Sequence, residues 1–343
     1  MYSLALRLDD TPKSTRPSEE SLLRQTADNI SGTARAGLMQ TTIQAPITMS
    51  GVGVHSGRAV TMTLHPAAAD TGILFNRVDI GDDDGFVLAH ATNAIETQLC
   101  TTIKNNVGTE VRMIEHLMAA FHGLGIDNVI VELNGPEVPI LDGSSAAIVE
   151  SINLVGIMAT DSARTYLEIL VPVTVELENG AWATLSPAPT LQLDIDIDFT
   201  DPGIGKQAFS FDSRDDAFGD EIARARTFCM FKDVEAMRLA GLGKGGSLEN
   251  ALVYDNGTLL NEGGLRMENE CVKHKALDCI GDLFLVGMPL KGRLSAHLPG
   301  HRLSTLVVKA LLADESAYRI TTENDAYDIA PSLERTLPLA ATA

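Results

Sequence analysis

The sequence predicts an α+β protein of two similar domains, each a sheet layered with helices, with an active site between them. Three observations lead to this prediction. Segments typical of strands are interspersed with a few amphipathic helical segments. The order helix, glycine break, strand and turn occurs twice, in residues 113–137 and in residues 273–301. Each of these two predicted helices carries a histidine near its start, His116 and His274.

Length and composition narrow the class of protein. The 343 residues are enough for two domains, and a hydrophobic content of 45% supports packed cores. A formal net charge of −20 argues against binding of nucleic acid, because that binding depends mainly on phosphate neutralisation. There is no CxxC pair, no secretion signal and no apolar run near the ~20 residues of a membrane span. We therefore expect a cytoplasmic monomer with reduced thiols and no membrane span.

The elements are expected in the following order along the chain. Residues 1–40 are polar and weakly periodic, which predicts a mobile N-terminal extension with a short helix at residues 18–30. A first α+β domain is expected at residues 41–162, and it opens with two strands around the glycine-rich turn "GVGVHSG". The boundary is placed in "GIMATDSAR", and a second α+β domain follows at residues 163–320. Residues 321–343 resemble a C-terminal tail.

Within the second domain, an insertion at about residues 229–259 has the pattern helix, glycine loop and strand. It is followed by "CVKHKALDCIGDLF", which predicts an amphipathic helix with a charged stripe. At about 100° per residue, His274 and Asp278 share one face, Asp282 continues it and Lys275 flanks it. A histidine and a carboxylate one turn apart can hold a divalent zinc ion. The His-x-x-x-Asp pattern is common, and on its own it more often marks a solvent-facing stripe with ion pairs.

His116 is the candidate third ligand. If it converges with His274 and Asp278, the three side chains leave a fourth position for water, which is typical of a catalytic zinc site. Glu115 precedes His116 and could then act as general base on that water. The alternative for Glu115 and His116 is a solvated helix start.

Four further residues are candidates for an active site. The glycine in "LPGHRLS" allows a sharp turn that presents His301 to a cleft, although a plain loop histidine is the alternative. Thr227 and Phe228, in "RARTFCM", offer a hydroxyl group and an apolar wall. Cys100, in "TQLCTTI", is expected to be a small buried residue and is counted among the substrate contacts.

Six separated stretches in a fixed order carry a family resemblance: "GVGVHSG", "RMIEHLMAAFHGLGIDNVIVELNGPEVPILDGS", "ARTF", "GKGGSLENALV", "LNEGGLRMENECVKHKALDCIGDL" and "PGHRLS". Over roughly residues 41–314 the sequence resembles the UDP-3-O-acyl-N-acetylglucosamine deacetylases, the zinc amidases that commit carbon to lipid A. The resemblance implies the two-domain α+β fold with the active site between the domains. It also implies a zinc ion on His116, His274 and Asp278, with Glu115 as general base.

The resemblance assigns roles to further residues. His301 matches an electropositive histidine that a carboxylate, Asp282, holds in place. Thr227 matches a residue that steadies the oxyanion, and Lys275 matches a lysine that contacts the substrate, a UDP-linked acylated glucosamine. The insertion matches a hydrophobic passage for the acyl chain, and we expect Leu248 and Ala251 in its wall.

Three positions depart from the family pattern. Leu298 replaces a lysine or arginine, Ser304 replaces an asparagine and Cys229 replaces a glycine. A phosphate contact is then missing or is supplied by another cation, such as Arg302 or Lys244. The departures leave open a divergent paralogue that deacetylates a related N-acyl sugar. A separate alternative, from another class of protein, is a non-catalytic zinc-containing regulatory protein.

Overall fold

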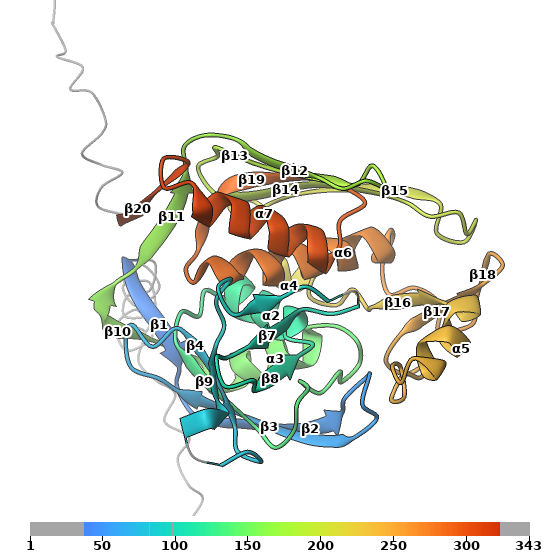
Figure 1. Ribbon diagram of the computed structural model, residues 1–343, viewed down its shortest axis with the longest axis horizontal. Helices are drawn as coiled ribbons and strands as arrows, with labels where there is room; N and C mark the ends of the chain where they lie inside the picture. The colour runs from blue at the N-terminus through green and yellow to red at the C-terminus, as the bar shows by residue number, and fades with distance from the viewer. Residues whose placement is uncertain (1–37, 82, 98, 323–343) are drawn as a thin grey trace, which may run out of the picture.

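The structure is a computed structural model that describes residues 38–81, 83–97 and 99–322. The predicted helix at residues 18–30, nearly all of the extension and nearly all of the tail lie outside these residues. The prediction of an α+β fold is confirmed, because several sheets are packed with helices (Figure 1). Two larger sheets form the top and bottom of the view in Figure 1, and helices lie between them.

The lower sheet has five strands in the order β2-β3-β9-β4-β5. Its residues alternate between the core and the outside, as in β3, where Val60, Met62 and Leu64 are buried. The strands of this sheet are β2 (Ile47–Val52), β3 (Ala59–Pro66), β4 (Ile73–Arg77), β5 (Phe86–Leu88) and β9 (Val129–Leu133). Beside it lie the short helix η1 (Asp83–Gly85) and a three-stranded sheet of β6 (Ala94–Ile95), β7 (Thr102–Lys104) and β8 (Glu110–Arg112). Helices α2 (Glu115–Leu124) and α3 (Ala146–Val155) complete this part of the protein.

The upper sheet has seven strands, and β19 is its central strand. β19 pairs in parallel with β11 and β14 and antiparallel with β13. β14 buries Leu191, Leu193, Ile195 and Ile197 in strict alternation. The strands are β11 (Thr165–Ile169), β12 (Val173–Glu176), β13 (Trp182–Ser186), β14 (Leu191–Asp198), β15 (Lys206–Asp212), β19 (Leu290–His297) and β20 (Tyr318–Thr322). The helices are α4 (Phe218–Glu221), α6 (Glu270–Leu283), η2 (Phe284–Val286) and α7 (His301–Ala313).

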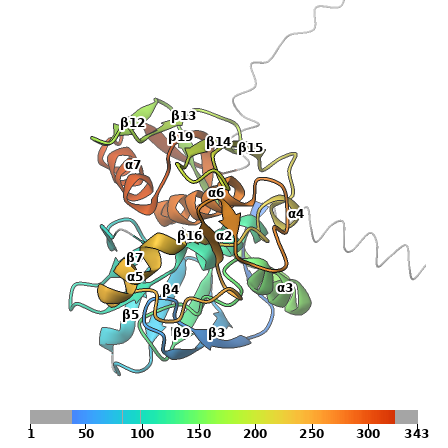
Figure 2. The same cartoon turned by 90° about the vertical axis from the view of Figure 1, so that its right-hand side faces the viewer.

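The predicted insertion forms a small unit at one side of the protein. Helix α5 (Phe231–Leu239) is followed by a glycine-rich loop and strand β17 (Leu252–Asp255), in the order that the sequence predicts. β17 lies between β16 (Phe228–Met230) and β18 (Thr258–Leu259). Figure 2 shows α5 and β16 facing the viewer, beside the ends of α6 and α2.

A separate two-stranded sheet joins β1 (Met39–Ile43) to β10 (Ile157–Ala163) in antiparallel pairing. Strand β1 begins at Met39. The sequence predicts that the ordered chain begins two residues later, at residue 41. The segment in which the sequence places the domain boundary, residues 160–164, coincides with the end of β10.

Helices α6 and α2 form the inner layer between the two large sheets, and both views show them next to each other (Figures 1 and 2). They approach closely at Gly281, where an added Cβ atom would overlap the backbone oxygen of Glu115. Only glycine permits this spacing. The helices are short, with 14 residues in α6 and 13 in α7. Among the described residues, none of the helices combines the length and apolar character that a bilayer crossing requires.

Candidate metal centre and active site

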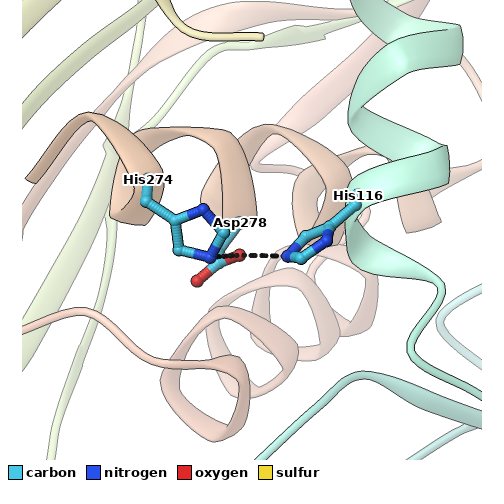
Figure 3. A group of neighbouring side chains, drawn as sticks. All are labelled: His116, His274 and Asp278. Carbon is cyan, nitrogen blue, oxygen red and sulfur yellow. Dashed lines mark ion pairs between the residues drawn. The ribbon is translucent and has the colours of Figure 1, made fainter. Parts of the chain in front are cut away.

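Three side chains from the two facing helices meet at one point (Figure 3). His116 extends from α2, whereas His274 and Asp278 extend from α6. One ligand atom from each lies within 4.8 Å of the other two. The Oδ1 atom of Asp278 is 3.6 Å from Nε2 of His116 and 3.3 Å from Nε2 of His274. The structure therefore brings together the three residues that the sequence singles out as metal ligands.

The chemistry of these donors fits a divalent cation. Oδ1 of Asp278 is buried and has no hydrogen-bond partner among the described residues, whereas Oδ2 accepts a hydrogen bond from Lys275 at 3.0 Å. The Nδ1 atom of His274 donates to the backbone oxygen of Ala225 at 3.0 Å, which leaves the Nε2 lone pair facing the cluster. A buried oxygen without a partner, beside a nitrogen that can only accept, is the arrangement that a bound cation would satisfy.

The pKa values of His274 and Asp278 also favour the binding of a cation. Burial lowers the pKa of His274 to about 3, so its imidazole is neutral. Burial raises the pKa of Asp278, but the neighbouring His274 and Lys275 outweigh this effect and hold that pKa well below its usual value. A neutral imidazole and an ionised carboxylate are the ligand forms that zinc binds.

Glu115 lies at the start of α2, directly before a ligand, and is only 1% exposed. Its Oε2 atom accepts a hydrogen bond from the backbone N–H of Thr101 at 3.0 Å, and its Oε1 atom is 3.6 Å from Nε2 of His301. Burial raises the pKa of this carboxyl group. A fixed carboxylate with a raised pKa is suited to accept and return a proton.

His301 lies at the first position of α7, and two polar neighbours hold its ring. Its Nδ1 atom is 3.1 Å from Oδ2 of Asp282 and 3.2 Å from the hydroxyl oxygen of Thr101. Burial lowers the pKa of His301, but the carboxylates of Asp282 and Glu115 raise it, and the result is about 9. The ring is therefore a cation at neutral pH, next to Glu115.

Thr101 is the residue of this site that sequence reasoning missed. Its backbone N–H donates to Glu115, and its hydroxyl group donates to Oδ1 of Asp282. It therefore contacts both the predicted base and the carboxylate that holds His301. In the sequence, Thr101 is marked only by its position directly after Cys100, which is counted among the candidate substrate contacts.

A cavity of about 350 Å³ lies next to the metal cluster, and its wall is shared between the insertion and residues of the first part of the chain, such as Val54, His55 and Met113. Its wall contains Thr227, Phe228, Leu248 and Ala251, all of which the sequence predicts as site residues. The ring of Phe228 connects the cavity to the cluster, because its centroid is 6.3 Å from that of the His274 ring. The Nζ atom of Lys275 lies 5.6 Å from the centroid of the same Phe228 ring. Cys229 is also in the cavity wall.

Cys100, which the sequence counts among the substrate contacts, does not line this cavity. It is packed in the hydrophobic core, and its Sγ atom is 3.6 Å from the hydroxyl oxygen of Thr102. Burial raises the pKa of its thiol group to about 12. It is not among the residues that line the cavity beside Phe228.

The structure shows the neighbours of Leu298 and Ser304, which depart from the family pattern, and of the two candidate phosphate contacts. Leu298 packs against the hydrophobic core and has a φ of 51°. Ser304 is buried, and its hydroxyl oxygen is 4.0 Å from Sγ of Cys279. Arg302 binds Glu96 at 2.9 Å, whereas Lys244 lines a cavity of about 280 Å³ together with two other cations, Arg58 and Arg112. Of the two candidate phosphate contacts, Lys244 thus lies in a basic pocket and Arg302 in an exposed ion pair.

The sequence is similar over most of its length to one family of known proteins. A family model described as UDP-3-O-acyl N-acetylglycosamine deacetylase matches residues 40–313. A protein of Brucella ovis named UDP-3-O-acyl-N-acetylglucosamine deacetylase is 46% identical over 282 residues, which cover 82% of this chain and 98% of that protein. A protein of Brucella melitensis biotype 2 with the same name is 45% identical over the same shares of both chains.

Proposed function

The chain belongs to the family of UDP-3-O-acyl-N-acetylglucosamine deacetylases, and from this premise we propose that it is a zinc-dependent hydrolase. It removes the acetyl group from UDP-3-O-acyl-N-acetylglucosamine in the committed step of lipid A biosynthesis. The observation that carries the proposal is the buried cluster of His116, His274 and Asp278 next to Glu115. One carboxylate oxygen of this cluster has no hydrogen-bond partner in the described part of the chain. Two imidazoles and one carboxylate are a donor set that suits zinc.

A zinc ion with three protein ligands keeps an open coordination position, lowers the pKa of water and polarises a carbonyl group. Glu115 takes a proton from the attacking water as the water oxygen bonds to the acetyl carbon. The same carboxyl group then gives the proton to the amine nitrogen as the C–N bond breaks, and acetate is released. Burial raises the pKa of Glu115, and this supports the double role, because a carboxyl group that holds a proton more readily can keep the proton from water until the amine accepts it.

The oxyanion that develops during attack needs positive charge and hydrogen-bond donors close to it. In this proposal His301 supplies the charge, and its pKa of about 9 keeps it protonated at neutral pH. Asp282 holds the ring through Nδ1, which leaves the Nε2 atom to face the substrate. Thr227 supplies a hydroxyl group. Thr101 is a positioning residue, because it binds both Glu115 and Asp282.

The acyl chain of the substrate is proposed to occupy the cavity beside Phe228. Apolar side chains dominate the part of the wall that the insertion supplies, and Leu248 and Ala251 are among them. Lys275, whose ammonium group lies over the Phe228 ring, is proposed to contact the sugar nucleotide at the cavity entrance.

Shortening the acyl chain is expected to lower kcat/KM strongly. Burial of each methylene contributes about 0.8 kcal/mol, or about fourfold in affinity, so removal of four methylenes is expected to lower kcat/KM by roughly two orders of magnitude. The measurement is kcat/KM across a series of chain lengths. Ala251→Phe, which fills part of the cavity, is expected to shift the preference towards shorter chains. Equal values for long-chain and unacylated substrates would rule out the cavity as the acyl site.

The function itself is tested by measuring acetate release from UDP-3-O-acyl-N-acetylglucosamine by the zinc-loaded protein. The same assay on other N-acyl sugars, each at a matched concentration, separates this substrate from the substrate of a divergent paralogue. Stoichiometric zinc without turnover on any of them would instead support a regulatory protein.

We also propose that residues 41–162 and 163–320 are two domains related by duplication. The origin of the ligands supports this division, because one helix of each part supplies them. Since one chain supplies every proposed catalytic group, a monomer is sufficient for activity. We propose a cytoplasmic location because Cys100, Cys229, Cys271 and Cys279 are all free thiols, as is usual in a reducing compartment.

A further inference from the structure

His55 is a buried polar residue that the proposed reaction does not yet use. It lies in the glycine-rich loop between β2 and β3 and is only 8% exposed. Both of its ring nitrogens are buried, and neither has a hydrogen-bond partner among the described residues. Buried polar groups are rarely left in this state, because the loss of their hydration is not compensated. The ring lines the same cavity as Thr227 and Phe228.

The loop that carries His55 is fixed from two sides. Glu137, which is 1% exposed, accepts hydrogen bonds from the backbone N–H groups of His55 at 2.7 Å and Ser56 at 2.9 Å. From the insertion, the N–H of Lys244 donates to the backbone oxygen of His55 at 3.3 Å, and the N–H of Gly245 donates to that of Val54 at 2.9 Å. Movement of the backbone to find the ring a protein partner would break these four bonds.

The ring is neutral and therefore offers one donor and one acceptor. Burial lowers the pKa of His55, and the charges of Arg112 and His301 lower it further against the opposing effect of Glu137. Most of the cavity wall is apolar, and the other side chains in it with strong hydrogen-bond donors are Thr227, Arg238 and Ser247. Of these four donors, His55 is the one whose ring is buried without a partner among the described residues.

The proposed substrate has a polar atom, the carbonyl oxygen of its acyl ester, that would lie near His55. Its acetamide and its acyl ester are on adjacent carbons of the sugar ring. If the acetamide lies beside Glu115 and the acyl chain occupies the cavity, the ester group lies between the two. Thr227, Phe228 and His55 line this cavity together, and Phe228 is next to His274 of the cluster.

We propose that His55 donates a hydrogen bond to the carbonyl oxygen of the ester that joins the acyl chain to the sugar. This inference rests on the proposed function and makes His55 a residue that determines specificity for an acyl ester. A substrate without that oxygen leaves the buried ring unpaired, and sites built in this way discriminate strongly against such analogues.

The test compares His55→Leu with the wild type on two substrates of equal chain length, the 3-O-acyl ester and the 3-O-alkyl ether, which lacks the carbonyl oxygen. For the wild type we expect kcat/KM to be roughly ten- to hundredfold lower on the ether, the effect of leaving one buried neutral donor without its partner. His55→Leu is expected to lose about the same factor on the ester and to lose nothing further on the ether. His55→Gln, which keeps an N–H donor, is expected to recover part of the preference for the ester.

Two controls separate this role from a structural one. Val54→Ala alters the same loop and the same cavity wall without removing a hydrogen-bond donor, so it is expected to lower kcat/KM on both substrates by one common factor. The thermal midpoint of His55→Leu is expected to equal or exceed that of the wild type, because an unpaired polar ring is replaced by an apolar side chain. A lower midpoint with equal losses on both substrates would overturn the inference. Absence of acetate release by the wild type would overturn the proposed function, and this inference with it.

Discussion

Replacement of Glu115 with glutamine is expected to reduce kcat by roughly 10²–10⁴, the usual contribution of a positioned acid–base group, and to leave the metal content unchanged. Glutamine has the same shape, and its amide oxygen can still accept the hydrogen bond from the N–H of Thr101. It cannot take a proton from water at neutral pH. Steady-state kinetics and elemental analysis of the same preparation provide the two measurements.

Glu132→Gln is the matched control. Glu132 lies on β9 in the same part of the protein, but its side chain is exposed and its partner is His65. Its replacement is expected to leave kcat and metal content at wild-type values. If Glu115→Gln retained a near-normal kcat with full metal content, another group would have to move the proton and the proposed mechanism would be wrong.

Replacement of His274 with alanine is expected to remove the metal and to reduce deacetylation to the background rate. Within the described part of the chain three side chains form the cluster, so the loss of one leaves two donors and an incomplete site. His116→Ala and Asp278→Ala are expected to have the same effect. Metal content after dialysis and acetate release are the first two measurements.

Thermal unfolding gives a third measurement that does not depend on turnover. A ligand at about 100 times its Kd stabilises the folded state by about 2.7 kcal/mol, so a chelator is expected to lower the thermal midpoint of the wild type. The same chelator is expected to leave the midpoint of His274→Ala unchanged. Lys273→Gln is the control on the same helix, because Lys273 binds Glu221 and not the cluster, and it is expected to keep both metal and activity. Full metal occupancy in His274→Ala would show that His274 is not a ligand.

The sequence could predict the part of the site that lies on one helix. The helical period alone places His274, Asp278 and Asp282 on one face, and the structure has them on one face of α6. The convergence of His116 with this helix could not be deduced from periodicity, since it depends on how two distant helices pack. The family resemblance supplied that information.

Other parts of the site have no local signature in the sequence. Thr101 is 14 residues from Glu115 and 181 residues from Asp282, and no pattern of spacing encodes contacts of this kind. His55 is part of the recognisable stretch "GVGVHSG", but the absence of partners around its ring is a property of the packed structure. The elements of the insertion were predicted in the correct order because glycines mark the end of its helix.

The close approach of α6 and α2 at Gly281 implies that a position with no functional group at all can tolerate very little mutation. A methyl group at this position would collide with the carbonyl oxygen of Glu115 and force the helices apart. Glu115 and His116 would then be displaced from Asp278 and His274, although every reacting group remained present. A displacement of about 1 Å can lower a rate about 10²-fold. In an engineered or evolving version of this protein, position 281 therefore limits which sequences remain active, without taking part in the chemistry.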